Sequence, residues 1–242
     1  MSSLHPLTKL YFALSISAAS VISANYSFIF SLFFVLLCIA FACKKGSSFV
    51  STTLKALGIL IVIIFLIQIF FYPGSDILWK NQTFRITQEG VDKGISLCSR
   101  ILVIGSALIL FFLLTKVQDL VKALEDAGLS PTAAFVVLAT LQIIPQMYAQ
   151  ALRIMDAQKS RGMENEGSLM LRAKAFVPVL GPLILQSIAS TEERAITLEA
   201  RGFLAKCKKT SLHKLPKGKL DKLLPPVFLL FLVVLIICRI FL

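Results

Sequence analysis

The sequence predicts an all-α protein that crosses a membrane several times, and three observations support this. Hydrophobic residues make up 57% of the 242 positions, and the mean hydropathy is +0.83, which a soluble domain of this size could not bury. These residues gather in blocks of the length that spans a bilayer. The cations also gather, because 16 of 25 Lys and Arg fall between Lys116 and Lys222. Basic loops stay in the cytoplasm, so the 116–222 region is predicted inside.

The first apolar block, 10–42, is too long for one ordinary span and short for two. A break near residues 23–27 divides it into two helices, at about 10–23 and 27–42. Two spans place Lys9 on the same side as Lys44 and Lys45, and all three are predicted to be cytoplasmic. The N-terminus is therefore expected inside.

Three more spans are predicted, at 52–72, 95–114 and 223–242, which gives five hydrophobic helices in all. The loop at 73–92 has few cations and is expected outside, as is the C-terminus. Arg100 lies near the outer end of the fourth span. Its side chain either snorkels to the interface or pairs inside the bundle.

Three amphipathic cytoplasmic helices are predicted between the fourth and fifth spans. The first covers about 116–127, begins with a capping box at Thr115 and ends before Gly128. Its apolar face carries Val117, Leu120, Val121 and Leu124.

The second amphipathic helix starts at Ser130 and Pro131 and runs to about residue 160. Its apolar stripe carries Tyr148, Leu152 and Met155. The third starts near Ser168 and ends at residues 201–202. The prolines expected to bend these two helices are Pro145, Pro178 and Pro182.

The chain is thus expected to have four regions. Residues 1–115 form a four-helix membrane region, and 116–203 form a cytoplasmic region of coupling helices. Residues 204–222 form a basic cytoplasmic loop, and 223–242 form the last transmembrane helix.

Both long amphipathic helices end in a small residue, an arginine and a glycine. The two segments are Ser160, Arg161 and Gly162, and Ala200, Arg201 and Gly202. Glycine ends a helix in the left-handed conformation, and the helix dipole favours a cation in the last turn. Each arginine would present a planar five-donor group suited to a partner's acidic groove or carbonyl oxygens. Ordinary helix capping at a lipid surface is the alternative.

The sequence gives little indication of nucleic-acid binding or of a metal or cofactor site. Nucleic-acid binding is disfavoured because the basic residues are interleaved with Glu and Asp and lie beside spans. With only two His and no C-x-x-C pair, neither a metal site nor a cofactor is expected.

The order of several short segments resembles the T component of energy-coupling factor (ECF) transporters, the EcfT/CbiQ family. The opening residues His5-Pro6-Leu7-Thr8-Lys9-Leu10 are similar to that family's Pro-x-Thr-Lys-Leu. Ile86 to Gly90 resembles its external loop, and Leu120 to Leu129 resembles its first amphipathic helix. Ile144 and Pro145 match its kink. The two arginine segments match its paired Ala-Arg-Gly motifs, except that Ser160 replaces the usual Ala.

The resemblance implies a non-catalytic membrane scaffold that joins two ABC-type ATPase subunits, separate or fused, to a membrane-embedded substrate-binding S component. It implies uptake of a micronutrient, either a vitamin or a transition-metal ion. Arg161 and Arg201 would dock on the ATPases. The apolar helix faces described above would cradle the S component, although packing against each other or lying on lipid explains them equally well.

Two other functions remain as alternatives. A stand-alone secondary transporter or channel usually needs ionisable or broken-helix sites at membrane depth, and the spans contain almost none. A membrane enzyme would have to use Asp156, Glu192, Glu193 or Glu199, which the solvent faces of helices explain. Nothing in the sequence identifies the transported substrate.

Overall fold

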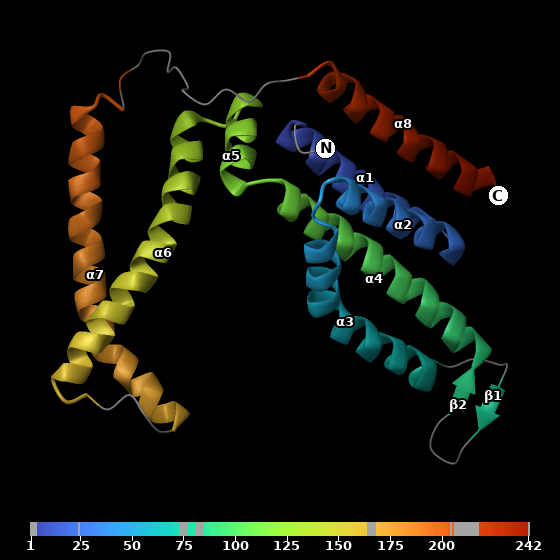
Figure 1. Cartoon of the computed structure of the whole chain (residues 1–242), viewed down its shortest axis with the longest axis horizontal. Helices are drawn as coiled ribbons and strands as arrows, with labels where there is room; N and C mark the ends of the chain where they lie inside the picture. Colours follow the sequence, from blue (N-terminus) through green and yellow to red (C-terminus); the bar gives the residue numbers. More distant parts are fainter. Residues whose placement is uncertain are drawn as a thin grey trace. The chain divides into compact units, whose positions relative to one another are not determined.

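A computed structural model describes residues 4–23, 25–72, 77–80, 85–163, 168–203, 205 and 218–241, and nearly all of them are helical (Figure 1). The helices are α1 Pro6–Ile22, α2 Tyr26–Ala42, α3 Gly46–Phe71, α4 Gln88–Leu114, α5 Val117–Asp126, α6 Pro131–Ser160, α7 Leu169–Ala200 and α8 Lys219–Phe241. The prediction of an all-α membrane protein is confirmed. The predicted basic loop at 204–222 lies outside the described residues, apart from 205 and 218–222.

The chain divides into two compact units. One contains α1 to α5 together with α8, and the other contains α6 and α7. The first unit also has a short antiparallel hairpin of β1 Ile77–Lys80 and β2 Arg85–Thr87 between α3 and α4 (Figure 1). The sequence did not predict this hairpin within the loop.

The observed helices differ most from the predicted spans at the starts of α3 and α4. α3 begins at Gly46 and α4 begins at Gln88, because the helical backbone continues beyond the apolar stretch at each N-terminus. Phe49 is fully buried in the first turn of α3, and the Thr87 hydroxyl caps α4 by accepting from the Gly90 N–H at 3.3 Å. Tertiary packing and a cap therefore determine where α3 and α4 begin, whereas the predicted helix starts were based on hydropathy alone.

The core of the first unit lies among α1, α2 and α4, with one residue, Phe49, from the start of α3. Its buried residues recur at helical spacing on each helix, and they are Ala13, Ile16, Ala19, Ile29, Leu32, Leu36, Ala40, Phe49, Val103, Ala107, Leu110 and Phe111. Buried serines do not interrupt this packing, because each hydroxyl donates to a carbonyl of the preceding turn, as Ser106 does to Val103 at 3.0 Å.

Glycines let α3 and α4 pack closely. A Cβ at Gly105 would come within 2.5 Å of Leu57, and one at Gly94 within 3.2 Å of Phe65. Small residues at such contacts are typical of membrane helices, which associate mainly through packing. α3 also carries large exposed apolar side chains, including Leu54 and Ile59.

Two arginines complete the C-terminal end of α1. The Arg100 guanidinium, from α4, donates to the Ser23 carbonyl at 3.0 Å, and Arg239, from α8, donates to the Ile22 carbonyl at 2.7 Å. The last carbonyls of a helix lack partners within it, and cations near them also complement the helix dipole. Of the two expectations for Arg100, pairing inside the bundle is the one that the structure supports.

Within the part of the chain that the structure describes, three helices are long and apolar enough to cross a membrane, namely α3, α4 and α6. α1, α2 and the 223–237 part of α8 are apolar but shorter. The count of five spans therefore stays a prediction. α6 was expected among the cytoplasmic helices, and it is the least apolar of the three, with Arg153, Asp156 and Lys159 in its C-terminal half.

The capping box predicted for α5 is wrong. Lys116 occupies the N-cap of α5 and makes no side-chain capping bond. Thr115 is instead the C-cap of α4, and its hydroxyl is buried with no hydrogen-bond partner among the described residues. Both residues are extended, so the chain crosses directly from α4 into α5 without a turn that Thr115 could cap.

Candidate functional site

The predicted arginine segment at the end of α6 forms a complete helix-terminating motif. Gly162 has a φ of +89°, and its N–H donates to the Lys159 carbonyl at 2.9 Å. The Met163 N–H reaches back to the Gln158 carbonyl at 3.1 Å. This pair of bonds defines a Schellman motif, and it places Arg161 at the C-cap.

The end of α7 repeats the same geometry. Gly202 has a φ of +68°, and its N–H donates to the Glu199 carbonyl at 2.9 Å. The Phe203 N–H donates to the Leu198 carbonyl, also at 2.9 Å. Arg201 therefore occupies the position that Arg161 has in the first motif. The predicted helix ends are confirmed at both segments.

The two arginines are exposed, and neither guanidinium has a hydrogen-bond or ion-pair partner in the part of the chain that the structure describes. The residues before them differ. The Ser160 hydroxyl donates to the Asp156 carbonyl at 3.2 Å, so it is turned back onto its own helix, whereas Ala200 has no polar side chain. Each helix end thus presents, beside a small residue, one arginine that makes no contact of this kind with the described residues.

Two contacts fix α7 against α6. Phe203 packs on Phe135 with ring centroids 4.7 Å apart and planes inclined by 50°. Arg194 donates to the Gln146 side-chain oxygen at 2.6 Å. Phe135 lies in the first turns of α6 and Arg161 at its other end, about 40 Å away at 1.5 Å per residue. The two arginine tips therefore lie at opposite ends of this helix pair.

The predicted apolar face of α5 is divided between two environments. Val121 and Ala123 are buried, and Leu120 packs against the core of the first unit. Val117 and Leu124 are exposed, by 43% and 39%. On α6, Tyr148 and Leu152 are exposed and Met155 is half-buried, so most of the predicted stripe remains at the surface.

The predicted prolines lie inside helices, Pro145 in α6 and both Pro178 and Pro182 in α7. Figure 1 shows α7 bent in its N-terminal half, where Pro178 and Pro182 fall. A proline removes one backbone hydrogen bond and crowds the preceding turn, which accounts for the bend. The bend predicted for α7 is observed.

Sequence reasoning missed Phe135, Gln146, Arg194 and Phe203, which join α6 to α7. One signal was present for Phe203, because a hydrophobic residue directly after the glycine commonly completes a Schellman motif. The other three lie within regular helices and show their role only through tertiary contacts. Among the described residues, no group of three or more His, Cys, Asp or Glu side chains is placed to hold a metal ion.

Comparisons with a family model and with individual proteins point to the same family. The model of the cobalt transport protein family, CbiQ, matches residues 1–212. The energy-coupling factor transporter transmembrane protein EcfT of Acidaminococcus fermentans is 30% identical over 205 residues, which cover 81% of this chain and 76% of that protein. EcfT of Bacillus selenitireducens is 30% identical over 200 residues, covering 78% and 74%. EcfT of Streptococcus equi subsp. equi is 33% identical over 180 residues, covering 70% and 66%. The chain therefore belongs to the EcfT/CbiQ family of transporter membrane proteins.

Proposed function

We propose that this chain, the transmembrane component of an energy-coupling factor transporter, docks two ABC-type ATPase subunits through Arg161 and Arg201. The observation that carries the proposal is the pair of matching Schellman motifs, each of which holds at the end of a long helix an exposed arginine that has no partner among the described residues. A rigid helix end gives the guanidinium a defined position, and its five donors suit carboxylates or carbonyls lining a groove. Two tips about 40 Å apart suit two separate binding sites, one on each ATPase subunit or one on each half of a fused ATPase.

The ATPases hydrolyse ATP in this proposal, and the chain itself is not catalytic. Closure of the two ATPases would move the two tips relative to each other. The contacts between Phe135 and Phe203 and between Gln146 and Arg194 join α6 to α7, so motion at one helix passes to the other. The positive-inside rule supports a cytoplasmic position for both tips, because most of the cations fall between Lys116 and Lys222.

A membrane-embedded S component is the second proposed partner. The exposed apolar side chains of α5 and α6 support this, chiefly Val117, Leu124, Tyr148 and Leu152. Exposed apolar stripes of this kind mark surfaces that another protein or lipid covers. The cargo would be a micronutrient, a vitamin or a transition-metal ion.

A stand-alone transporter or channel is the alternative function. It would need ionisable groups facing a path through the spans. Arg100, the ionisable residue expected in the fourth span, instead closes the end of α1 by donating to the Ser23 carbonyl. This contact favours the scaffold over a self-sufficient carrier.

Arg161→Ala, Arg201→Ala and the double variant test the docking proposal. Removing one partner of a desolvated charge contact typically costs about 2–5 kcal/mol, so each single variant should bind the ATPases at least 30-fold more weakly. The measurement is co-purification of ATPase subunits with the membrane chain, followed by ATP-driven uptake in proteoliposomes. Arg153→Ala is the matched control, because Arg153 is an exposed arginine on α6 away from the tip.

The double variant gives the decisive result. If it retained both ATPases and transported at the wild-type rate, the docking proposal would be wrong. Uptake by the purified chain without any ATPase would favour the stand-alone transporter instead.

A further inference from the structure

The last carbonyls of α4 are held by two lysines from distant parts of the first unit. Lys9, in the first turn of α1, donates from its Nζ to the Leu114 carbonyl at 3.0 Å. Lys45, in the turn between α2 and α3, donates from its Nζ to the Leu113 carbonyl at 2.5 Å. A charged donor at a free helix carbonyl forms a strong hydrogen bond and complements the helix dipole. The end of α4 is thus tied to both preceding segments.

Lys9 is unusual because it is only 8% exposed, and lysines are seldom buried unless they are paired. Burial lowers the pKa of Lys9 and the charge of Lys45 adds to this, whereas the carboxylates of Asp119, in the first turn of α5, and Asp221, near the start of α8, attract the Lys9 charge and oppose the shift. Asp221 in turn accepts from the His5 and Gly218 backbone N–H groups, each at 2.9 Å. The start of α1 therefore meets the end of α4 and the start of α8 in one polar cluster.

This cluster, formed by His5, Thr8, Lys9, Lys45 and Asp221, lies directly at the joint between α4 and α5. Only Thr115 and Lys116 connect the two helices, and both are extended. α5 also packs against α1 and buries Val121 and Ala123. Force on α5 therefore reaches the spans both through its packing on α1 and through the carbonyl end of α4, where the two lysines bind.

We infer that Lys9 and Lys45 are positioning residues that clamp the α4–α5 joint, so that α5 stays fixed on the spans when the arginine tips move. The inference rests on the proposed function, because it needs motion delivered by docked ATPases. It also gives a role to Thr8 and Lys9 of the opening segment, which ATPase docking leaves unexplained. The Thr8 hydroxyl bonds to the Asp221 carboxylate, so this pair of residues contacts both α8 and α4.

The test measures the distance between spin labels on α5 and α1. Labels at Gln118→Cys and Val21→Cys, both exposed positions, are placed in the full transporter complex after replacement of the native cysteines by alanine. The wild-type clamp should give one narrow distance that is the same with and without ATP and vanadate. Lys9→Met with Lys45→Met should lose that narrow distance, and Lys9→Arg with Lys45→Arg should restore it.

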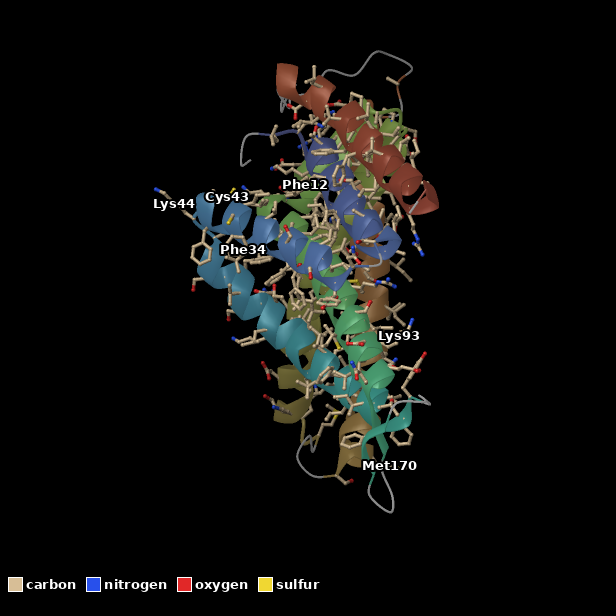
Figure 2. The ribbon with its side chains drawn as sticks, turned by 90° about the vertical axis from the view of Figure 1, so that its right-hand side faces the viewer. Phe12, Phe34, Cys43, Lys44, Lys93 and Met170 are labelled. Carbon is tan, nitrogen blue, oxygen red and sulfur yellow. The ribbon has the colours of Figure 1, made fainter. Side chains whose placement is uncertain are left out.

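Lys44→Met is the matched control, because Lys44 is adjacent to Lys45 but points away from the helices (Figure 2). A second label pair, Val21→Cys with Leu108→Cys, reports on α1 and α4 within the spans and should not change in any variant. A narrow α5 distance in the double Met variant would overturn the inference. Equal broadening in Lys44→Met, or in the second pair, would do so too, because it would indicate general loss of structure.

Co-purification of the ATPases is measured on the same samples. It should be unchanged in the lysine variants, since the arginine tips are intact. Failure of the wild-type chain to bind ATPases would refute the proposed function, whereas retained binding with an unaltered α5 distance in the Met variants would refute only the clamp.

Discussion

Gly162→Ala and Gly202→Ala probe whether the helix ends hold the two arginines in position. Both glycines have a positive φ, +89° and +68°, in a region that costs an L side chain about 1–2 kcal/mol. No atom lies within 4 Å of the position that a Cβ would occupy at Gly162, so the substitution adds backbone strain without a steric clash. We expect either change to loosen the last helical turn and to weaken ATPase binding by about 5- to 30-fold.

The affinity is measured by titrating the membrane chain, held in lipid nanodiscs, with the ATPase subunits that co-purify with it. The fold-losses of ATPase affinity in the two single variants should multiply in the double variant, because the tips are about 40 Å apart and share no contact with each other. Gly181→Ala is the control, since Gly181 lies inside α7 with an ordinary φ and no neighbour within 4 Å. Wild-type affinity in both tip variants would refute the idea that the Schellman geometry positions the arginines.

Three further predictions concern the contacts around the tips and the spans. Phe203→Leu should remove an aromatic contact with Phe135 that is worth about 0.5–1.5 kcal/mol, and limited proteolysis should then cut faster next to Arg201 than next to Arg161. Arg100→Ala leaves the Ser23 carbonyl without its charged donor and should lower the stability in detergent by about 1.5–3 kcal/mol, whereas Arg153→Ala should not. Partial burial raises the pKa of Asp221, but hydrogen bonds from His5, Gly218 and Thr8 outweigh this and lower it below its ordinary value. The stability that these bonds confer is therefore present above about pH 4 and is lost as the pH falls through the lowered pKa, and a melting series from pH 6 to pH 3 should show a smaller loss in Asp221→Asn.

Local signals predicted the helices around the arginine tips well. Ser130 caps α6 by accepting from the Ala133 N–H at 3.2 Å, and Gly128 ends the preceding helix with a φ of +123°, both as the sequence indicated. These features depend on residues three or four apart, so the sequence contains all of the information. The glycine motifs at Gly162 and Gly202 were predictable for the same reason.

Contacts between distant residues were not predictable. Lys9 and Leu114 are 105 residues apart, and Arg239 and Ile22 are 217 residues apart. No local pattern links such pairs, because their meeting depends on how the helices pack. The N-terminal starts of α3 and α4 were misplaced for a related reason. Polar residues near Gly46 and Gln88 reduce hydropathy, while packing and capping keep the backbone helical.

The arginines at the end of α1 have a consequence for how the protein is made. α1 has 17 residues and is about 25 Å long, so it is shorter than a hydrocarbon core of about 30 Å. The last carbonyls of α1 need partners inside the bilayer, and those partners belong to α4 and to α8, whose Arg239 follows Ile22 by 217 residues. The end of α1 is therefore fully paired only after α8 has been synthesised and has packed beside it. A chain truncated before Arg239 would leave the Ile22 carbonyl without this charged donor.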